Sequence, residues 1–178
     1  MSLPACATWL TARGAPPATH PGRAILAALT LSAAACVRAA DSPGPAYPQG
    51  AAAFQANCAI CHGPTGAGVA SLAPPLLAYP ARYAASAEGR RQLALTVLYG
   101  MFGEITVGDS RYNFQMPEFV RLDDTTLAAV LNFLVFDLGH APAQTAPVSA
   151  SEIAAERAHP LDGAAVREHR QSVLASGT

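Results

Sequence analysis

Two cysteines and a histidine lie within five consecutive residues of this 178-residue chain, in the stretch CAICH from Cys58 to His62. Two thiols separated by two residues can form a redox disulfide, half of a zinc site or the attachment point of a haem. A histidine directly after the second thiol favours the haem, because two thioether bonds fasten the porphyrin while the adjacent imidazole reaches the iron. The motif predicts one covalent haem c on Cys58 and Cys61, with His62 as an iron ligand.

The two rival chemistries need residues that the chain does not offer nearby. A zinc site requires further ligands, but Cys6 and Cys36 lie in a segment predicted to be removed, and the later histidines lie in a predicted linker and tail. A redox disulfide of the thioredoxin type requires a strand–helix–strand setting. The pattern around Cys58 is helical, so haem attachment remains the favoured interpretation.

Composition and charge argue against a nucleic-acid-binding protein. All eleven basic residues are arginines, and from Ala40 onward 8 arginines stand against 12 acidic residues, a net charge of 8 − 12 = −4. A basic patch that binds nucleic acid is therefore not expected. With 178 residues, 51% of them hydrophobic, the chain has room for one modest domain with extensions.

Residues 1–40 are predicted to be a secretory signal. The apolar run from Ala24 to Cys36 follows Arg23 and is too short to span a membrane, and the small residues up to Ala39 suit cleavage. Two alternatives stay open: the segment is retained as an anchor, or SAAAC is a lipoprotein signal in which Cys36 carries the lipid. All three place the folded part outside the cytoplasm, so a periplasmic location is predicted, with membrane contact only under the two alternatives.

Three helices are predicted, and they give an all-α fold class. The first runs from Gln49 to about Cys58, with Gly50 and Phe54 on one face. The second runs from Ser86, an N-cap residue, to Gly100, a C-terminal stop. The third is capped by Asp123, carries a clear apolar stripe and ends at Gly139.

The remaining segments of the predicted domain, residues 49–140, are irregular. An extended, proline-rich linker over 41–48 precedes the domain. Glycines and prolines predict a loop from Gly63 to Pro80. Weak alternation around Gly108 predicts a small hairpin or Ω-loop over 104–114.

A linker and a short helical tail are predicted for residues 141–178. The tail contains a faint repeat, thirteen residues apart, in 148–157 and 161–170. Each copy has a cap residue, a branched apolar residue (Ile153 or Val166) and a terminal arginine. Two short docking helices fit this pattern, and so does chance similarity in an alanine-rich tail.

The stretches FQANCAICHGPTGAGVASLAPPL, MPEF and LDDTTLAAVLNFL together resemble class I monohaem c-type cytochromes. The resemblance implies three main helices and loops around one covalently bound haem, with the first and last helices crossing. Gly50 and Phe54 would then meet Val130 and Phe133. The segment GEITVGDSRYNFQMP resembles an insertion before the distal methionine in small periplasmic cytochrome c subunits that serve dehydrogenases.

The family also implies a second iron ligand, a methionine that precedes the last helix. Met116 matches it, because it lies in a predicted loop and is followed by Pro117. Met101 is the rival, at the end of a predicted helix and without a following proline. A bis-histidine site would instead recruit His140 or a histidine of the tail.

In the family, a proline carbonyl accepts the other N–H of the histidine ligand, and a leucine shortly after it packs on the haem. The PPL stretch offers Pro74 as the acceptor for His62 and Leu76 as the haem contact. Pro75 would take the first role if the register shifts. Such an acceptor fixes the imidazole plane and raises its basicity.

The predicted function is one-electron transfer, because an iron with both axial positions filled by protein has no place for oxygen or peroxide. The chain is expected to be an electron carrier rather than an enzyme, free or as a small subunit of an enzyme complex. Its expected partners are redox proteins: a periplasmic dehydrogenase as donor, and an oxidase or another cytochrome as acceptor. A haem peroxidase and a gas sensor are the alternatives, and both require Met116 to leave the iron.

Overall fold

The computed structural model describes residues 44–177 of the chain. The expectations for the signal over 1–40, for Cys36 and for the first residues of the linker, 41–43, lie outside the described residues. Within them, no helix is both long and apolar enough to cross a membrane.

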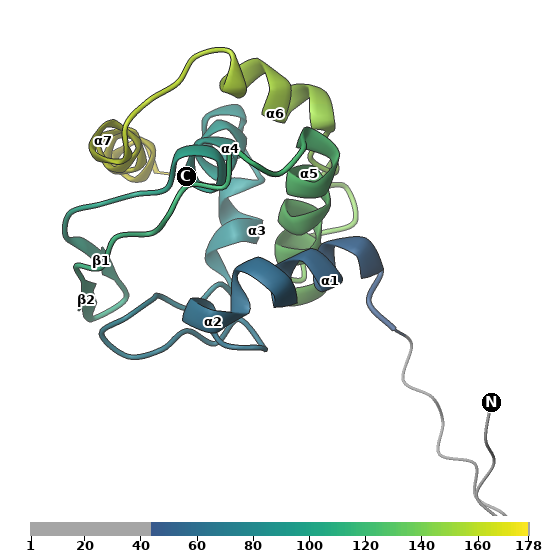
Figure 1. Cartoon of the computed structure of the whole chain (residues 1–178), viewed down its shortest axis with the longest axis horizontal. Helices are drawn as coiled ribbons and strands as arrows, with labels where there is room; N and C mark the ends of the chain where they lie inside the picture. The colour runs from purple at the N-terminus through teal and green to yellow at the C-terminus, as the bar shows by residue number, and fades with distance from the viewer. Residues whose placement is uncertain (1–43, 178) are drawn as a thin grey trace, which may run out of the picture. The chain divides into compact units, whose positions relative to one another are not determined.

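The described part of the chain is mainly helical, as Figure 1 shows, so the predicted all-α class is confirmed. The three expected helices are present as α1, as α4, and as α5 continued by the π-helical segment η1. The described residues also form two short helices, α2 and α3, two helices in the tail, α6 and α7, and one two-stranded hairpin. The elements are α1 (Pro48–Asn57), α2 (Ala59–His62), α3 (Tyr79–Tyr83), α4 (Ala87–Tyr99), β1 (Ile105–Val107), β2 (Ser110–Tyr112), α5 (Asp124–Asn132), η1 (Phe133–Leu138), α6 (Ala150–Arg157) and α7 (Gly163–Ala175).

Helix α1 packs across α5 and η1, the crossing that the family resemblance implied (Figure 1). Gly50 is buried at the crossing, and a Cβ there would collide with the backbone of Ala129 and with Phe133. The close approach therefore depends on the missing side chain. Phe54 is fully buried, and its ring lies 5.4 Å from that of Phe133, so the predicted aromatic contact is confirmed. Gly50 meets Ala129 rather than the expected Val130, one position away.

Helix α4 begins and ends where its sequence predicted. The Ser86 side chain accepts a hydrogen bond from the backbone N–H of Gly89 at 3.0 Å, which satisfies one of the free amides of the first turn. Gly100 follows the last residue with φ +66°, a conformation that favours glycine. The same logic applies to α5, where the Asp123 carboxylate accepts from the N–H of Thr126 at 2.8 Å.

Two features of the helices differ from the prediction. The loop expected over 63–80 ends in the short helix α3, which has Pro80 in its first turn. The sequence did not predict this helix, because five residues are too few to show an apolar period. The last helix changes from α to π geometry at Phe133 and ends before Gly139, as predicted. The expected hairpin is confirmed, with Ile105 paired to Tyr112 across the turn.

The C-terminal tail folds back onto α4 and α5 as two helices. Their branched residues, Ile153 in α6 and Val166 in α7, are both fully buried, so the thirteen-residue repeat marks two docked helices. The buried side chain of Asn132 holds the connection, because its amide donates to the carbonyl of Val148 at 2.9 Å and accepts from the N–H of the same residue at 2.7 Å.

Glu152 fastens the start of α6 to α4. Its carboxylate accepts two hydrogen bonds of 2.7 Å from the guanidinium of Arg90 and closes a capping box with Ser149. Hydrogen bonds from Arg90 and from Ser149 hold the pKa of Glu152 near 2, well below its ordinary 4.5. A depressed pKa contributes stability above the ordinary value, and this contribution is lost as the pH falls from about 4.5 to about 2.

We therefore expect Glu152→Gln to lower the free energy of unfolding by up to about 1 kcal/mol at neutral pH, because it removes the charge paired with Arg90, whereas a glutamine can still complete the capping box with Ser149. The loss should shrink as the pH falls below about 4.5, because the wild-type carboxylate protonates there on unfolding. Thermal melts from neutral to acidic pH measure both effects. Glu168→Gln, an exposed change on α7, is the control. Equal melting curves for the two variants at neutral pH would contradict the prediction.

Candidate haem site

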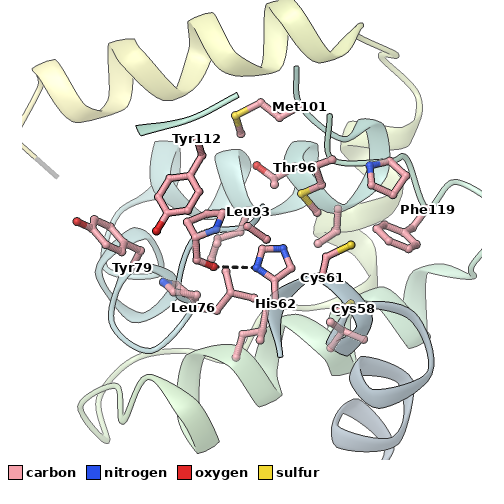
Figure 2. A pocket seen from close by; sticks show the side chains of 18 of the residues that line it. Cys58, Cys61, His62, Leu76, Tyr79, Leu93, Thr96, Met101, Tyr112 and Phe119 are labelled. Atoms are coloured by element: carbon pink, nitrogen blue, oxygen red, sulfur yellow. Dashed lines mark hydrogen bonds between the residues drawn. The ribbon is translucent and has the colours of Figure 1, made fainter. Parts of the chain in front are cut away.

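The site is built around His62, the last residue of the short helix α2. Its imidazole is 8% exposed, and its Nδ1 lies 2.9 Å from the carbonyl oxygen of Pro74 (Figure 2). Since a carbonyl only accepts, Nδ1 carries the proton and Nε2 keeps its lone pair. Burial lowers the pKa of His62, although the Pro74 hydrogen bond opposes the shift. The ring is thus held neutral and oriented, the state in which imidazole binds a metal.

The loop after His62 folds so that Pro74 returns to it. The N–H of Gly68 donates to the carbonyl of His62 at 2.8 Å, and Val69 pairs with Ala73 in an isolated bridge. Gly68 has φ +80°, and a Cβ there would lie 2.7 Å from the backbone of Pro75. A glycine at this position therefore permits the close return of the chain. Pro74, and not Pro75, presents the carbonyl to His62.

Cys58 and Cys61 flank one turn of helix beside His62 (Figure 2). Burial, with a smaller contribution from Cys61, raises the pKa of Cys58 to about 11, so this thiol is held in its protonated form. Within residues 44–177, no three histidine, cysteine or acidic side chains come together to hold a metal ion. Among these described residues, the pair and its histidine have no further ligands of the kind a structural zinc site needs.

These residues border a cavity of about 430 Å³, within the range of roughly 300–1,000 Å³ typical of cofactor sites. Most of the lining is apolar, and Leu76, the expected haem contact, belongs to it. Helices α3 and α4, the hairpin and α5 supply further walls. Those walls include Tyr83, Leu93, Val97, Tyr112, Leu127 and Leu131.

Both candidate methionines line this cavity. Their backbones pair, with the N–H of Met116 donating to the carbonyl of Met101 at 2.8 Å and the reverse bond at 3.2 Å. Figure 2 shows Met101 across the pocket from His62. Met101 is 9% exposed and packs in a small core with Leu95 and Val166, whereas Met116 is only half-buried and touches the edges of both cores. The bis-histidine alternative has no support here, because His62 is the only histidine among the described residues that line the cavity.

Tyr83 and Arg170, two polar residues of the cavity wall, were not predicted from the sequence to lie at the site. Tyr83 comes from the unpredicted helix α3, and Arg170 comes from α7 in the tail. In the sequence, Arg170 stands out only as the terminal arginine of the faint repeat. Nothing in its neighbourhood indicates that the guanidinium points inward, because only the docking of α7 brings it there.

A helical shell around an apolar cavity, with a CxxCH turn at its edge, defines a haem protein of the c type. Residues 48–135 match the family model described as Cytochrome c. A cytochrome c-552 of Thermus thermophilus is 36% identical over 124 residues, which cover 68% of this chain and 95% of the relative. A second cytochrome c-552, from strain ATCC 27634 of the same species, is also 36% identical, over 68% of this chain and 84% of the relative.

The chain belongs to the cytochrome c family, as a class I monohaem c-type cytochrome. It therefore carries one covalently attached haem c, and its CxxCH motif is formed by Cys58, Cys61 and His62. Its function is electron transfer to and from other redox proteins, not catalysis.

The residues present fit this cofactor. The cavity wall is apolar, as a macrocycle requires, and a neutral imidazole and thioether sulfurs are available to iron. When bound, haem c supplies a reversible one-electron couple between two oxidation states of iron. The chain's own residues set the environment of that couple through axial ligands, hydrogen bonding and exclusion of water.

Proposed function

We propose that this chain carries single electrons through a haem ligated by His62 and Met116. The observation that carries the proposal is the hydrogen bond between Nδ1 of His62 and the carbonyl of Pro74, which leaves Nε2 available to the iron. Both methionines line the same cavity as His62. Met116 is favoured over Met101 because its side chain is less fully enclosed in a core, and because Pro117 follows it in an irregular segment. Leu76 would pack on the macrocycle from the loop that carries Pro74.

A thioether ligand suits a carrier at the high-potential end of a chain of redox proteins. Sulfur of methionine is a soft ligand that stabilises Fe(II), so His/Met ligation raises the reduction potential. The surrounding apolar wall excludes water and thereby favours the reduced state of the haem, which carries less charge. The wall therefore also raises the reduction potential.

We propose that the protein works in the periplasm, after removal of residues 1–40, between a dehydrogenase as donor and an oxidase or another cytochrome as acceptor. A fixed place as the cytochrome subunit of an enzyme complex is the alternative. Access for partners is supported by Ile60, which lies between the two cysteines, lines the cavity and is 87% exposed. Phe114, also at the cavity, is 64% exposed. The chain has no lysine, so a partner that docks at this apolar edge would not be held by lysine side chains around it.

Carbon monoxide binding tests the proposal. We expect the reduced protein to be low-spin and inert to carbon monoxide at neutral pH, because His62 and Met116 would together fill both axial positions of the iron. The absorption spectrum before and after addition of the gas is the measurement. Rapid formation of a carbon monoxide complex would overturn the carrier proposal and favour a haem peroxidase or a gas sensor.

A further inference from the structure

Arg170 is the only permanently charged side chain among the described residues that line the haem cavity. It is 7% exposed, and its Nη2 donates to the backbone carbonyl of Thr106 in β1 at 3.0 Å. It forms no ion pair with any residue of 44–177. A guanidinium thus stands in an apolar wall, and its polar neighbours, the Thr106 carbonyl and the Tyr83 hydroxyl, are both neutral.

Such an arrangement calls for an anion. A guanidinium does not lose its proton in proteins, and a buried charge is costly unless it is paired and hydrogen-bonded. Most of the five N–H donors of Arg170 are not used by the Thr106 carbonyl. The ligand that completes the site must therefore bring negative charge to this part of the wall.

Tyr83 contributes a second unused donor to the same cavity. The residue is 8% exposed, and its hydroxyl is buried without a well-formed hydrogen bond to any described residue. Burial raises the pKa of Tyr83, and the neighbouring guanidinium of Arg170 opposes this shift. The hydroxyl therefore stays protonated at neutral pH and is able to donate.

We propose that Arg170 and Tyr83 together bind a propionate carboxylate of the haem. The two propionates are the only anionic side groups of the macrocycle, and a guanidinium offers a carboxylate two parallel hydrogen bonds. Tyr83 adds a third donor from α3. The tail helix α7, which lies beyond the residues matched by the family model, thereby becomes part of the cofactor site.

Helix α7 is held firmly enough for this role. Asp162 caps its first turn by accepting from the N–H groups of Ala164 and Ala165. Val166 is fully buried against Leu95 and Met101. One turn further, His169 Nδ1 lies 2.6 Å from the side-chain oxygen of Gln92 in α4. These contacts fix the turn of the helix that leads to Arg170.

The pairing has a consequence for the redox chemistry. A guanidinium against the propionate keeps that carboxylate ionised to lower pH and offsets its charge near the iron. Since reduction adds an electron, loss of the positive charge should lower the reduction potential. No lysine or acidic residue is among the described residues of the wall. Its other titratable side chains are those of Cys58, Cys61, His62, Tyr79, Tyr83 and Tyr112.

The test is the reduction potential of the haem-loaded protein as a function of pH. Arg170→Gln should lower the potential at neutral pH and move the propionate titration upward, so that the potential becomes pH-dependent in the mildly acidic to neutral range. Arg167→Gln is the matched control, because it removes the same charge from the same helix at a residue that does not line the cavity. A potential and a pH profile that are equal in the two variants would overturn the proposal.

Two milder variants cover the case in which Arg170→Gln does not accumulate as folded protein. Tyr83→Phe removes only the hydroxyl, and Arg170→Lys keeps the charge but not the paired donors. Both should shift the infrared carboxylate bands of the haem propionates, with Arg170→Lys retaining most of the wild-type potential. Unmoved propionate bands in both variants would overturn the proposal. The result is independent of the axial methionine, which the visible spectrum reports separately.

Discussion

Replacing both Cys58 and Cys61 by alanine should abolish covalent haem capture. The two sulfurs are the only cysteine thiols in the described part of the chain, and both line the cavity. Without them, no thioether bond to the porphyrin can form. The measurement is a haem stain of the denatured chain after expression together with a competent haem-attachment machinery, where the wild type should stain and the double variant should not.

The same variant should lose most of its folded stability. Core cavities cost about 24 cal/mol per Å³, so leaving about 430 Å³ unfilled costs up to roughly 10 kcal/mol. Water entry and collapse of the walls lower this upper bound. A typical domain is stable by only about 5–15 kcal/mol. Circular dichroism should therefore show a large drop in melting temperature.

Ile60→Ala is the control for this experiment. Ile60 lies in the same turn as the cysteines but is 87% exposed, so its loss should change neither the stain nor the melting temperature by much. Haem that stays bound to the denatured double variant would contradict attachment through these cysteines.

The parts of the fold that the sequence predicts are those with local causes. Ser86 and Gly100 bound α4 because a cap and a glycine turn act within a few residues of themselves. The hairpin at Gly108 and the start of α5 at Asp123 have equally local signals. The proline–leucine stretch after the CxxCH turn is also close in sequence, and Pro74 lies at hydrogen-bonding distance from His62.

The parts that escape prediction depend on distant contacts. Helix α3 has five residues, too few to show a period, yet it carries Tyr83 into the cavity. Arg170 reaches the wall only because Val166 and His169 dock α7 on α4. From sequence, an arginine within an amphipathic helix is typical of a solvated charge. Its burial follows from tertiary packing, which periodicity does not encode.

Met116→Ala should change the iron site without removing the haem. Loss of the thioether should abolish the weak methionine-to-iron charge-transfer band of the oxidised protein and let the reduced protein bind carbon monoxide. Axial ligands set haem potentials over a range of about 0.8 V, so we expect the potential to fall by on the order of 0.1 V or more. Absorption spectra and a redox titration measure these effects.

Met101→Ala separates ligation from packing, because the two methionines are paired through their backbones and line the same cavity. Met101 is 9% exposed in a core with Leu95 and Val166, so its truncation should cost about 2–5 kcal/mol of stability while the charge-transfer band persists. The opposite pattern, a band that survives Met116→Ala and disappears in Met101→Ala, would transfer the axial role to Met101. The tail helix that packs on Met101 would then support the iron ligand directly.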